Sequence, residues 1–523
     1  MLDSTFTLYD SYKKQNLPIV ANNNKIKIYS CGPTVYSYQH IGNMRAIWLA
    51  SSFVDLTNIL DIETEWVLNV TDVGHLVGDG DDSQNTNSGE DKFEKGAKKD
   101  GKSIQELVSF YQKDYENQCS SLNIKLPKGK YYPKATDYIN EQMILALKLL
   151  EEKKAYLLDD GIYFDSEANQ NLDVPFELVK GDREFTGRKI ENTTKNPADF
   201  ALWKFVNDNS LQKWRFNEFD DTASLMLSIV QDLPDSRFLD LPNRWGCPGW
   251  HSECVAMICK ILSGSFPPNL KASNSVVDIH FGGEDHIDIH HKNEILQSEA
   301  LNFHLSNLWV HNKFVTIDGK KMAKSIGNVY TIIGSKKDTG FQSIEEQGYD
   351  PLSYRLLLQE HHFTSQLDFT WGKLKQSQNR LHNLRKETAK IVSFWNSMII
   401  EPKPDLTSTK KQNDILSQPL KDNFNVPRFL EKYEELVNET SNAIINTNTV
   451  NANNITTLKY WEKAFLKLDL FPIIPKKITL LANQRILAKN EKNYQKSDEI
   501  RDQILAFGYQ IDDYPWGYGI WMK

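Results

Sequence analysis

The chain has 523 residues, of which 40% are hydrophobic, so it is long enough for about two to four domains with apolar cores. Its formal net charge of -8 excludes a uniformly basic nucleic-acid-binding protein, although a local basic face on such a chain can still bind phosphate. No apolar segment reaches membrane-spanning length, the first residues do not form a signal sequence, and five cysteines do not suit a disulfide framework. These features predict a protein of the reducing cytoplasm.

The first predicted element is a strand-turn-helix junction. Residues 26–29 form an apolar strand, and apolar residues recur at helical spacing from 44 to 56. Between them runs Cys31-Gly-Pro-Thr-Val-Tyr-Ser-Tyr-Gln-His-Ile-Gly-Asn43. Because backbone N–H groups at a helix start are unpaired and lie at the positive end of its dipole, this junction predicts a phosphate site. Gly42 would allow close approach to the backbone, and His40 would donate a hydrogen bond to a phosphoryl oxygen.

Further strands and helices follow in an alternating order. A second strand is predicted from Glu65 to Val70, and the polar segment Gly78–Gly101 is expected to be a mobile loop. A capping box begins a helix over 103–122, with Phe110 and Cys119 on its apolar face, and another helix covers about 136–154. This pattern is typical of a doubly wound α/β sheet. Mixed periodicity between about 156 and 244 predicts an insertion packed on that fold.

A block rich in cysteine, histidine and acidic residues comes next. Its three parts are Cys247–Cys254, Asp278–Asp285 and His290–Glu294. Thiolate, imidazole and carboxylate groups are the ligands that zinc takes in proteins. His290 and Glu294 are four residues apart, so on a helix they project from one face toward one ion. Local spacing leaves two ways to complete the site, with His251 and Cys254 or with Cys247 and Cys254.

The basic segment Lys320-Lys-Met-Ala-Lys-Ser-Ile-Gly-Asn328 follows. Lys321 and Lys324 can neutralise the charge that develops when pyrophosphate leaves the α-phosphate of ATP, although a solvated basic loop has the same composition. Together with His40-Ile-Gly-Asn43, the segment resembles the two signature motifs of the class I aminoacyl-tRNA synthetases, HIGH and KMSKS. The sequence departs from these motifs at Asn43, which is typical of the cysteinyl branch, and at Ala323.

The rest of the chain is mainly helical. Heptad-like spacing from 374 to 391 and an amphipathic pattern after Asp422 predict an α-helical bundle, with an exposed loop at about 402–417. From Arg485 to Lys523, aromatic residues alternate with polar ones. This composition suits the recognition of unstacked RNA bases, and a small self-packed cap fits it equally well.

The chain resembles the cysteinyl-tRNA synthetase family over nearly its whole length, through several motifs in the same order. These motifs are Cys31-Gly-Pro-Thr-Val-Tyr36, Pro248-Gly-Trp-His-Ser-Glu-Cys254, Asp278-Ile-His-Phe-Gly-Gly-Glu-Asp285 and His290-His-Lys-Asn-Glu294. The resemblance implies one zinc ion per chain. The zinc ligands that it implies are Cys31, Cys254, His290 and Glu294. The residues that it implies around the amino-acid substrate are Thr71, Trp250, His280 and Asp285.

The same resemblance implies roles in binding ATP and tRNA. ATP, bound together with Mg²⁺, would be held by His40, Gly42, Asn43 and Lys324. The residues implied in catalysis are His40, Asn43, Lys321 and Lys324. The positions implied to contact the tRNA anticodon are Lys489, Asp498 and Asp513. Lysine stands at position 489 where the family is expected to have arginine, so a bidentate base contact is not expected there.

The fold that the resemblance implies is a Rossmann-like, doubly wound parallel α/β sheet with an insertion, followed by an α-helical bundle and a small anticodon-binding domain. The expected divisions are a catalytic domain at 1–330 with its insertion at about 120–245, a connecting stem region at 331–370, the bundle at 371–480 and the anticodon-binding domain at 481–523. The segment 205–247 is longer than the family leads us to expect.

The activity implied is ATP-dependent ligation of L-cysteine to tRNA(Cys) through a cysteinyl-adenylate, by a cytoplasmic monomer without a membrane partner. One alternative is a cysteine:amino-sugar ligase of thiol biosynthesis, which resembles the catalytic half, and the tail after Arg485 argues against it. Another alternative is a non-catalytic, synthetase-like RNA-binding protein. The presence of His40, Lys321, Lys324 and four metal ligands argues against that second alternative.

Overall fold

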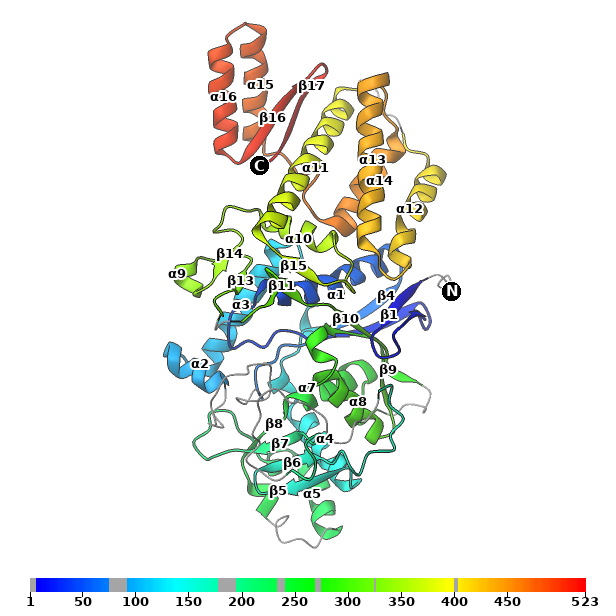
Figure 1. Cartoon of the computed structure of the whole chain (residues 1–523), viewed down its shortest axis with the longest axis vertical. Coiled ribbons are helices and arrows are strands. Elements are labelled where there is room, and N and C mark those ends of the chain that lie inside the picture. The colour runs from blue at the N-terminus through cyan, green and yellow to red at the C-terminus, as the bar shows by residue number, and fades with distance from the viewer. Residues whose placement is uncertain are drawn as a thin grey trace.

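The computed structural model describes residues 6–74, 92–176, 194–232, 240–268, 274–323, 326–398 and 403–523. Its centre is a four-stranded sheet in the order β10-β9-β3-β4, in which all neighbouring strands are parallel (Figure 1). The strands are β3 (Lys25–Ser30), β4 (Glu63–Leu68), β9 (Ser275–Gly283) and β10 (His304–Asn312). Helix α1 (Ile41–Ile59) connects β3 to β4, and α8 (His290–Ala300) connects β9 to β10. The sheet is therefore wound in two directions from β3.

Two separate cores cover the two faces of this sheet. Successive strand residues point to opposite faces, so Ile28 packs in the core that contains α1, whereas Tyr29 packs in the other. The second core contains residues of α8 and of α7 (Trp250–Ile258). Helices on both faces confirm the predicted doubly wound α/β fold.

Short elements surround the central sheet. At the amino end, β1 (Thr7–Asp10) pairs with β2 (Gln15–Pro18). Strand β11 (Val315–Ile317) pairs antiparallel with β12 (Lys320–Lys321) and parallel with β15 (Leu367–Phe369). Further along, β13 (Tyr330–Thr331) pairs with β14 (Gln342–Ser343), and α9 (Lys336–Thr339) lies between them in the sequence. The basic segment thus begins on a hairpin that joins β11 to β12.

Helix α3 (Ile104–Ser121) begins at the predicted capping box. Ser103 Oγ accepts a hydrogen bond from the Glu106 backbone N–H at 3.2 Å, and Glu106 Oε2 accepts one from the Ser103 N–H at 2.8 Å. Cys119 is buried, as predicted. Phe110 was expected on the apolar face but is 42% exposed, and its ring packs edge-on against Tyr38.

The expectation of a mobile loop at Gly78–Gly101 is wrong for its last part. Residues 75–91 lie outside the described residues, but α2 (Lys92–Asp100) is a regular helix. Phe93 and Ala97 lie one turn apart and are buried in a cluster with Leu107. Two apolar residues are enough to pack this short polar helix against Leu107. Two such residues give only a weak periodic signal in the sequence.

The insertion between β4 and β9 has a sheet of its own, in the order β5-β6-β7-β8, with all neighbours antiparallel. Its strands are β5 (Ala155–Leu158), β6 (Gly161–Phe164), β7 (Ala201–Phe205) and β8 (Gly246–Pro248). Helix α4 (Ile139–Glu151) precedes this sheet, and α5 (Asp220–Asp232) lies between β7 and β8 in the sequence. In Figure 1 the insertion lies at the opposite end of the molecule from the carboxyl-terminal helices.

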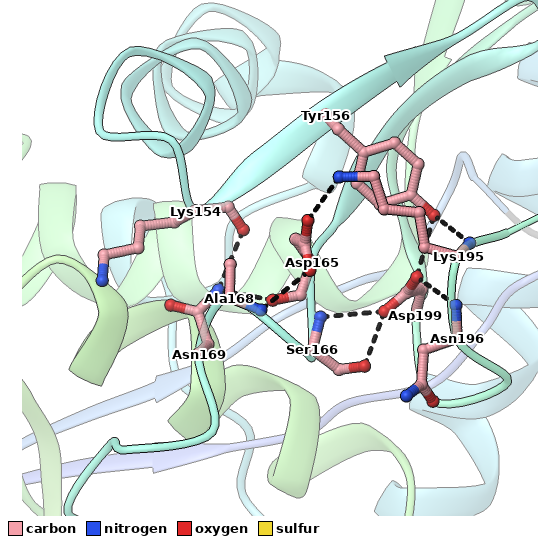
Figure 2. Close-up of polar contacts among 9 residues, drawn as sticks. All are labelled: Lys154, Tyr156, Asp165, Ser166, Ala168, Asn169, Lys195, Asn196 and Asp199. Atoms are coloured by element: carbon pink, nitrogen blue, oxygen red, sulfur yellow. Dashed lines mark hydrogen bonds and ion pairs between the residues drawn. The ribbon is translucent and has the colours of Figure 1, made fainter. Parts of the chain in front are cut away.

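A polar network joins the segments that leave β6 and enter β7 (Figure 2). Asp199 Oδ1 accepts hydrogen bonds from the Ser166 N–H at 2.8 Å and from its hydroxyl at 2.6 Å, and Oδ2 accepts one from the Tyr156 hydroxyl at 2.8 Å. The Lys195 ammonium lies 2.7 Å from Asp165. Since both oxygens of Asp199 are used within the fold, this carboxylate stabilises the insertion.

The helical bundle follows the central domain. It is preceded by α10 (Pro351–Gln359), and its helices are α11 (Trp371–Ser397), α12 (Leu406–Lys421), α13 (Val426–Thr447) and α14 (Ala452–Trp461). The expected loop at 402–417 is wrong from residue 406 onward, where α12 begins. Asp405 caps this helix by accepting from the backbone N–H groups of Thr407 and Ser408, and Leu416 and Leu420 bury its inner face. Among the described residues, no helix has the length and apolar composition needed to span a membrane.

The carboxyl-terminal unit combines two helices with a hairpin. Its elements are α15 (Lys476–Asn490), α16 (Tyr494–Ala506), β16 (Tyr509–Tyr514) and β17 (Gly517–Met522). The unit has a small core of its own that includes Ile478, Ile504 and Ile511. Strand β17 also packs on α11, and Trp521 is only 2% exposed. At least this aromatic residue therefore serves packing and is closed to RNA bases.

Candidate active site and metal centre

The junction after β3 ends in a reciprocal helix cap. His40 is the N-cap of α1, and its Nδ1 accepts a hydrogen bond from the Asn43 N–H at 3.3 Å. In return, Asn43 Oδ1 accepts one from the His40 N–H at 3.0 Å. Asn43 thus fixes the start of the helix at the end of a parallel strand, where anionic ligands commonly bind α/β sheets.

The basic segment contacts this helix start, although the two lie far apart in the sequence. A Cβ atom built on Gly42 would lie only 2.6 Å from Cε of Met322 and 3.0 Å from Cε1 of His40. Lys321 is exposed on β12. Lys324 lies outside the described residues. The structure therefore brings His40, Gly42 and the described part of the basic segment into one region.

Three elements bring four metal-ligating side chains together. Cys31 follows β3, Cys254 lies on α7, and His290 and Glu294 lie one turn apart on α8. One ligand atom of each side chain lies within 4.8 Å of those of the other three. Cys254, His290 and Glu294 are buried, and Cys31 is partly buried. Two sulfurs, one imidazole nitrogen and one carboxylate oxygen form a donor set that suits Zn²⁺.

The geometry of Glu294 also fits a shared metal ion. Its Oε1 lies 3.0 Å from His290 Nε2, and its Oε2 lies 3.0 Å from His280 Nε2. Neither oxygen meets hydrogen-bond geometry with any described residue, despite these short separations. Both carboxylate oxygens of Glu294 thus face imidazole nitrogens at short range without a geometric hydrogen bond, which suits a carboxylate that shares a cation with them.

Burial and charge perturb the ionisation of all four groups. Burial disfavours charge on Glu294, but His280 and His290 hold the pKa of its carboxyl well below the usual range. Burial also opposes charge on His290, yet Glu294 and Cys254 raise its pKa to about 10. For Cys254, a hydrogen bond from Cys31 and the charge of His290 outweigh burial and lower the pKa to about 6. Burial and the hydrogen bond to Cys254 raise the pKa of Cys31. These shifts favour anionic Cys254 and Glu294, the form that binds metal, whereas the raised pKa of His290 means that a metal ion has to displace its proton.

Local spacing left two pairs open as further ligands, His251 with Cys254 and Cys247 with Cys254. Only Cys254, which both pairs contain, belongs to the observed set. Neither His251 nor Cys247 belongs to a potential metal-binding group of the described residues. His251 Nδ1 instead lies 3.1 Å from His290 Nδ1. Cys247 is buried in β8, on the insertion sheet.

Sequence reasoning missed two histidines beside the cluster. His291 Nε2 lies 3.3 Å from Cys31 Sγ, and His291 Nδ1 lies 2.7 Å from His311 Nε2 on β10. Cys31, His280, His291 and Glu294 form a second group whose ligand atoms lie within 4.8 Å of one another. The doubled histidine was visible in the sequence, but helical spacing to Glu294 selects only the first of the pair.

Two of the expected pocket residues contact the cluster directly. The Trp250 ring stacks on His290, with 4.4 Å between ring centroids. His280 is fully buried and stacks on Trp309 at 4.7 Å. These rings wall the metal-ligating groups on two sides.

Thr71 and Asp285 lie at strand ends near the same region. Thr71 follows β4, pairs with Thr34 of the junction and accepts a hydrogen bond from Asn69 Nδ2 at 3.1 Å. Asp285 lies on the turn after β9, where its charge helps to raise the pKa of Cys31. Both residues therefore lie at the carboxyl edge of the parallel sheet, as the ends of β4 and β9 require.

Of the three expected anticodon residues, Lys489 and Asp513 contact each other. Asp513 on β16 accepts hydrogen bonds from Arg485 Nη1 at 2.5 Å and Nη2 at 2.9 Å and also pairs with Lys489. Asp498 lies exposed on α16 and pairs with Arg501 at 3.4 Å. Lys489 and Asp513 are thus adjacent, while Asp498 belongs to a different helix.

Comparisons with known proteins point to one family. The family model described as "tRNA synthetases class I (C) catalytic domain" matches residues 18–216 and 231–379. A cysteine–tRNA ligase of Treponema denticola is 31% identical over 98% of this chain and 97% of its own length. This chain belongs to the cysteinyl-tRNA synthetase family. Other similar members of the family are cysteine–tRNA ligase 1 of Burkholderia lata, 30% identical over 98% of this chain and 95% of its own, and the enzyme of Borrelia garinii, 29% identical over 94% and 95%.

Among solved structures, a Mycobacterium tuberculosis methionyl-tRNA synthetase in complex with methionyl-adenylate is 12% identical to this synthetase-family chain. The match has a TM-score of 0.48 and covers 85% of this chain and 90% of that one.

Proposed function

We propose that this protein is an ATP-dependent ligase that joins L-cysteine to tRNA(Cys) through a cysteinyl-adenylate. The observation that carries the proposal is the largely buried set of Cys31, Cys254, His290 and Glu294, whose member Cys31 lies on the segment between β3 and the helix that His40 caps. A thiol-selecting metal site beside a phosphate site is what activation of cysteine by ATP requires. Similarity to curated cysteine–tRNA ligases over nearly the full chain supports the same function.

His40, Gly42 and Asn43 would bind ATP at the amino end of α1. His40 would donate to a phosphoryl oxygen, and Gly42 keeps the backbone open to close approach. Lys321 and Lys324 would stabilise the negative charge that accumulates as pyrophosphate leaves, and Mg²⁺ would accompany ATP. Catalysis then depends mainly on holding the cysteine carboxylate in line with the α-phosphate.

Zinc, one ion per chain, would be held by Cys31, Cys254, His290 and Glu294. When bound, it supplies a soft Lewis acid that accepts the thiolate of cysteine and discriminates against the hydroxyl of serine. Trp250 and His280 would enclose the substrate side chain and exclude water from it. Thr71 and Asp285 would orient its amino and carboxyl groups from the strand ends.

The bundle and the carboxyl-terminal unit would bind tRNA. Within the proposed anticodon-binding domain, 481–523, the proposed contacts are Lys489, Asp498 and Asp513. Because Arg485 already donates to both oxygens of Asp513, tRNA would meet this carboxylate in a pre-organised position. The other proposed domains are the catalytic domain at 1–330 with its insertion at about 120–245, the connecting stem region at 331–370 and the helical bundle at 371–480.

Two features bear on the alternatives. A cysteine:amino-sugar ligase would not require the carboxyl-terminal unit that aligns with full-length cysteine–tRNA ligases here. A non-catalytic RNA-binding protein would not require a largely buried set of four converging metal-ligating side chains. We further propose a monomer in a reducing compartment such as the cytoplasm, which fits five cysteines without a disulfide.

Amino-acid-dependent exchange between pyrophosphate and ATP tests the function directly. With each of the twenty amino acids in turn, cysteine should give the strongest exchange, and the purified protein should contain about one zinc ion per chain. Charging of tRNA(Cys) with labelled cysteine should follow. The proposal is contradicted if none of the amino acids supports exchange, or if another amino acid supports it more strongly than cysteine.

A further inference from the structure

Arg45 joins α1 to the entry of the basic segment. Its side chain is completely buried, and burial lowers its pKa to about 10, so it is protonated at neutral pH. Nη1 donates to the carbonyls of Lys313 at 2.9 Å and Phe314 at 3.2 Å. Nη2 donates to the carbonyls of His362 at 3.0 Å and Ser365 at 2.7 Å. One guanidinium thus fixes the backbone just before β11 and just before β15, the two strands paired beneath the hairpin.

Gln118 makes a corresponding link at the exit of the segment. This residue of α3 is completely buried, and its Nε2 donates to the Gln39 carbonyl at 3.2 Å, directly before the His40 cap. Its Oε1 accepts a hydrogen bond from the Ile332 N–H at 3.1 Å, directly after β13. Nε2 also donates to Asp114 at 2.6 Å, which holds the amide in this orientation.

The hydrogen bonds of Arg45 and Gln118 tie both ends of the basic segment to the start of α1. Arg45 is the fifth residue of α1, and Gln118 contacts the residue before its cap. Between the two links, Met322 reaches the surface of Gly42. In Figure 1 the elements involved, α1, α3, β11 and β13, lie together between the insertion and the bundle.

We propose that Arg45 and Gln118 are positioning residues for adenylate formation, which hold the two ends of the basic segment in register with His40 and Asn43. The inference rests on the proposed function. Groups that act on opposite sides of a reacting phosphate must be held within a fraction of an ångström, and a misplacement of about 1 Å can reduce a rate about a hundredfold. Neither side chain needs to touch ATP for this role.

A purely structural role would affect folding alone, and Arg355 supplies the matched control. It is also buried and also donates only to backbone carbonyls, those of Leu122 at 2.8 Å, Phe465 at 3.1 Å and Leu466 at 2.6 Å. Burial lowers its pKa to about 10, as for Arg45. Its bonds join α10 to the end of α3 and to the turn after α14, so they leave the basic segment untouched.

The experiment compares Arg45→Lys and Gln118→Met with Arg355→Lys in the full chain. Thermal unfolding, zinc content, the kcat of pyrophosphate exchange and the KM values for ATP and cysteine are measured for each. Trypsin cleavage after Lys320 and Lys321, followed by mass spectrometry, reports on the segment without any need for activity.

Arg45→Lys and Gln118→Met should lower the exchange kcat about ten- to a hundredfold, with the KM for cysteine changed by less than about twofold and zinc retained. Both should speed cleavage after Lys320 and Lys321. Arg355→Lys should lower the melting temperature to a similar degree, with kcat within about twofold of the wild type. If Arg45→Lys fails to fold, Gln118→Met decides the question.

The proposal is overturned if Arg355→Lys loses as much kcat as the other two at a temperature where all are folded, or if cleavage of the segment is unchanged in them. Failure of the proposed function has a different signature, because wild-type exchange would then not depend on cysteine. The trypsin comparison would still test the positioning role in that case.

Discussion

Replacing Cys254 by serine should remove zinc and cysteine binding together. The structure places Cys254 Sγ within 4.8 Å of three other ligand atoms, and the hydrogen bond from Cys31 and the charge of His290 outweigh burial and lower its pKa to about 6, which favours the thiolate at pH 7. A serine hydroxyl remains neutral there and is a hard, weak ligand. Since changes outside the ligand set already cost about 10- to 100-fold in metal affinity, loss of this thiolate should cost at least about 100-fold.

Cys259→Ser is the matched control for this prediction. Cys259 is equally buried, it directly follows the same helix, and burial alone raises its pKa. Its replacement should cost about 1 to 3 kcal/mol of stability, because a hydroxyl is buried, but zinc should remain.

Two measurements decide between these variants. Elemental analysis after dialysis against a chelator should find zinc in the wild type and in Cys259→Ser but not in Cys254→Ser. Pyrophosphate exchange should show that Cys254→Ser raises the KM for cysteine far more than the KM for ATP. Retention of zinc by Cys254→Ser, or equal loss from both variants, would refute the reasoning.

Three further predictions concern charge and domain structure. Lys321→Ala should lower the exchange kcat about 10- to 100-fold with little change in the KM for cysteine. Lys320 is the neighbouring residue on β12, and Lys320→Ala should keep a kcat near that of the wild type. Equal effects of the two substitutions would mean that the segment acts only through its net charge. Removing the chain from Lys476, where α15 begins, should preserve exchange but impair tRNA charging, and full charging by a folded truncated protein would assign the unit a structural role. Burial raises the pKa of Asp513, but hydrogen bonds from Arg485 and Lys489 lower it by more. Asp513→Asn should therefore destabilise α15 by about 1 kcal/mol or less. The stability difference between the wild type and Asp513→Asn should be complete above the ordinary aspartate pKa of 3.8 and should vanish as the pH falls through the lower pKa of the folded state. Hydrogen exchange between pH 7 and pH 3 can follow it. A stability difference that grows on acidification would contradict the pairing.

Local patterns in the sequence predicted much of the candidate site. The strand at 26–29, the helix after His40 and the capping box at Ser103 depend on contacts within a few residues, and all three are present in the structure. The same holds for the shared face of His290 and Glu294, since helix geometry alone places residues four apart side by side. Polar segments were less informative, because α2 and α12 each depend on a few buried side chains supplied by distant elements.

The sequence by itself determined which chemical groups are present and which lie on a common turn or helix face: a capped helix start, a lysine segment, and a histidine and a glutamate on one helix face. Spacing left open whether His251 with Cys254 or Cys247 with Cys254 accompanies that pair. The family resemblance implied Cys31 and Cys254, but only the tertiary structure brings them to the pair, because Cys31, Cys254 and the α8 residues come from three elements that meet at the carboxyl edge of a parallel sheet. The same packing revealed His291, Arg45 and Gln118, whose partners lie 20 to 320 residues away, beyond the reach of any local pattern.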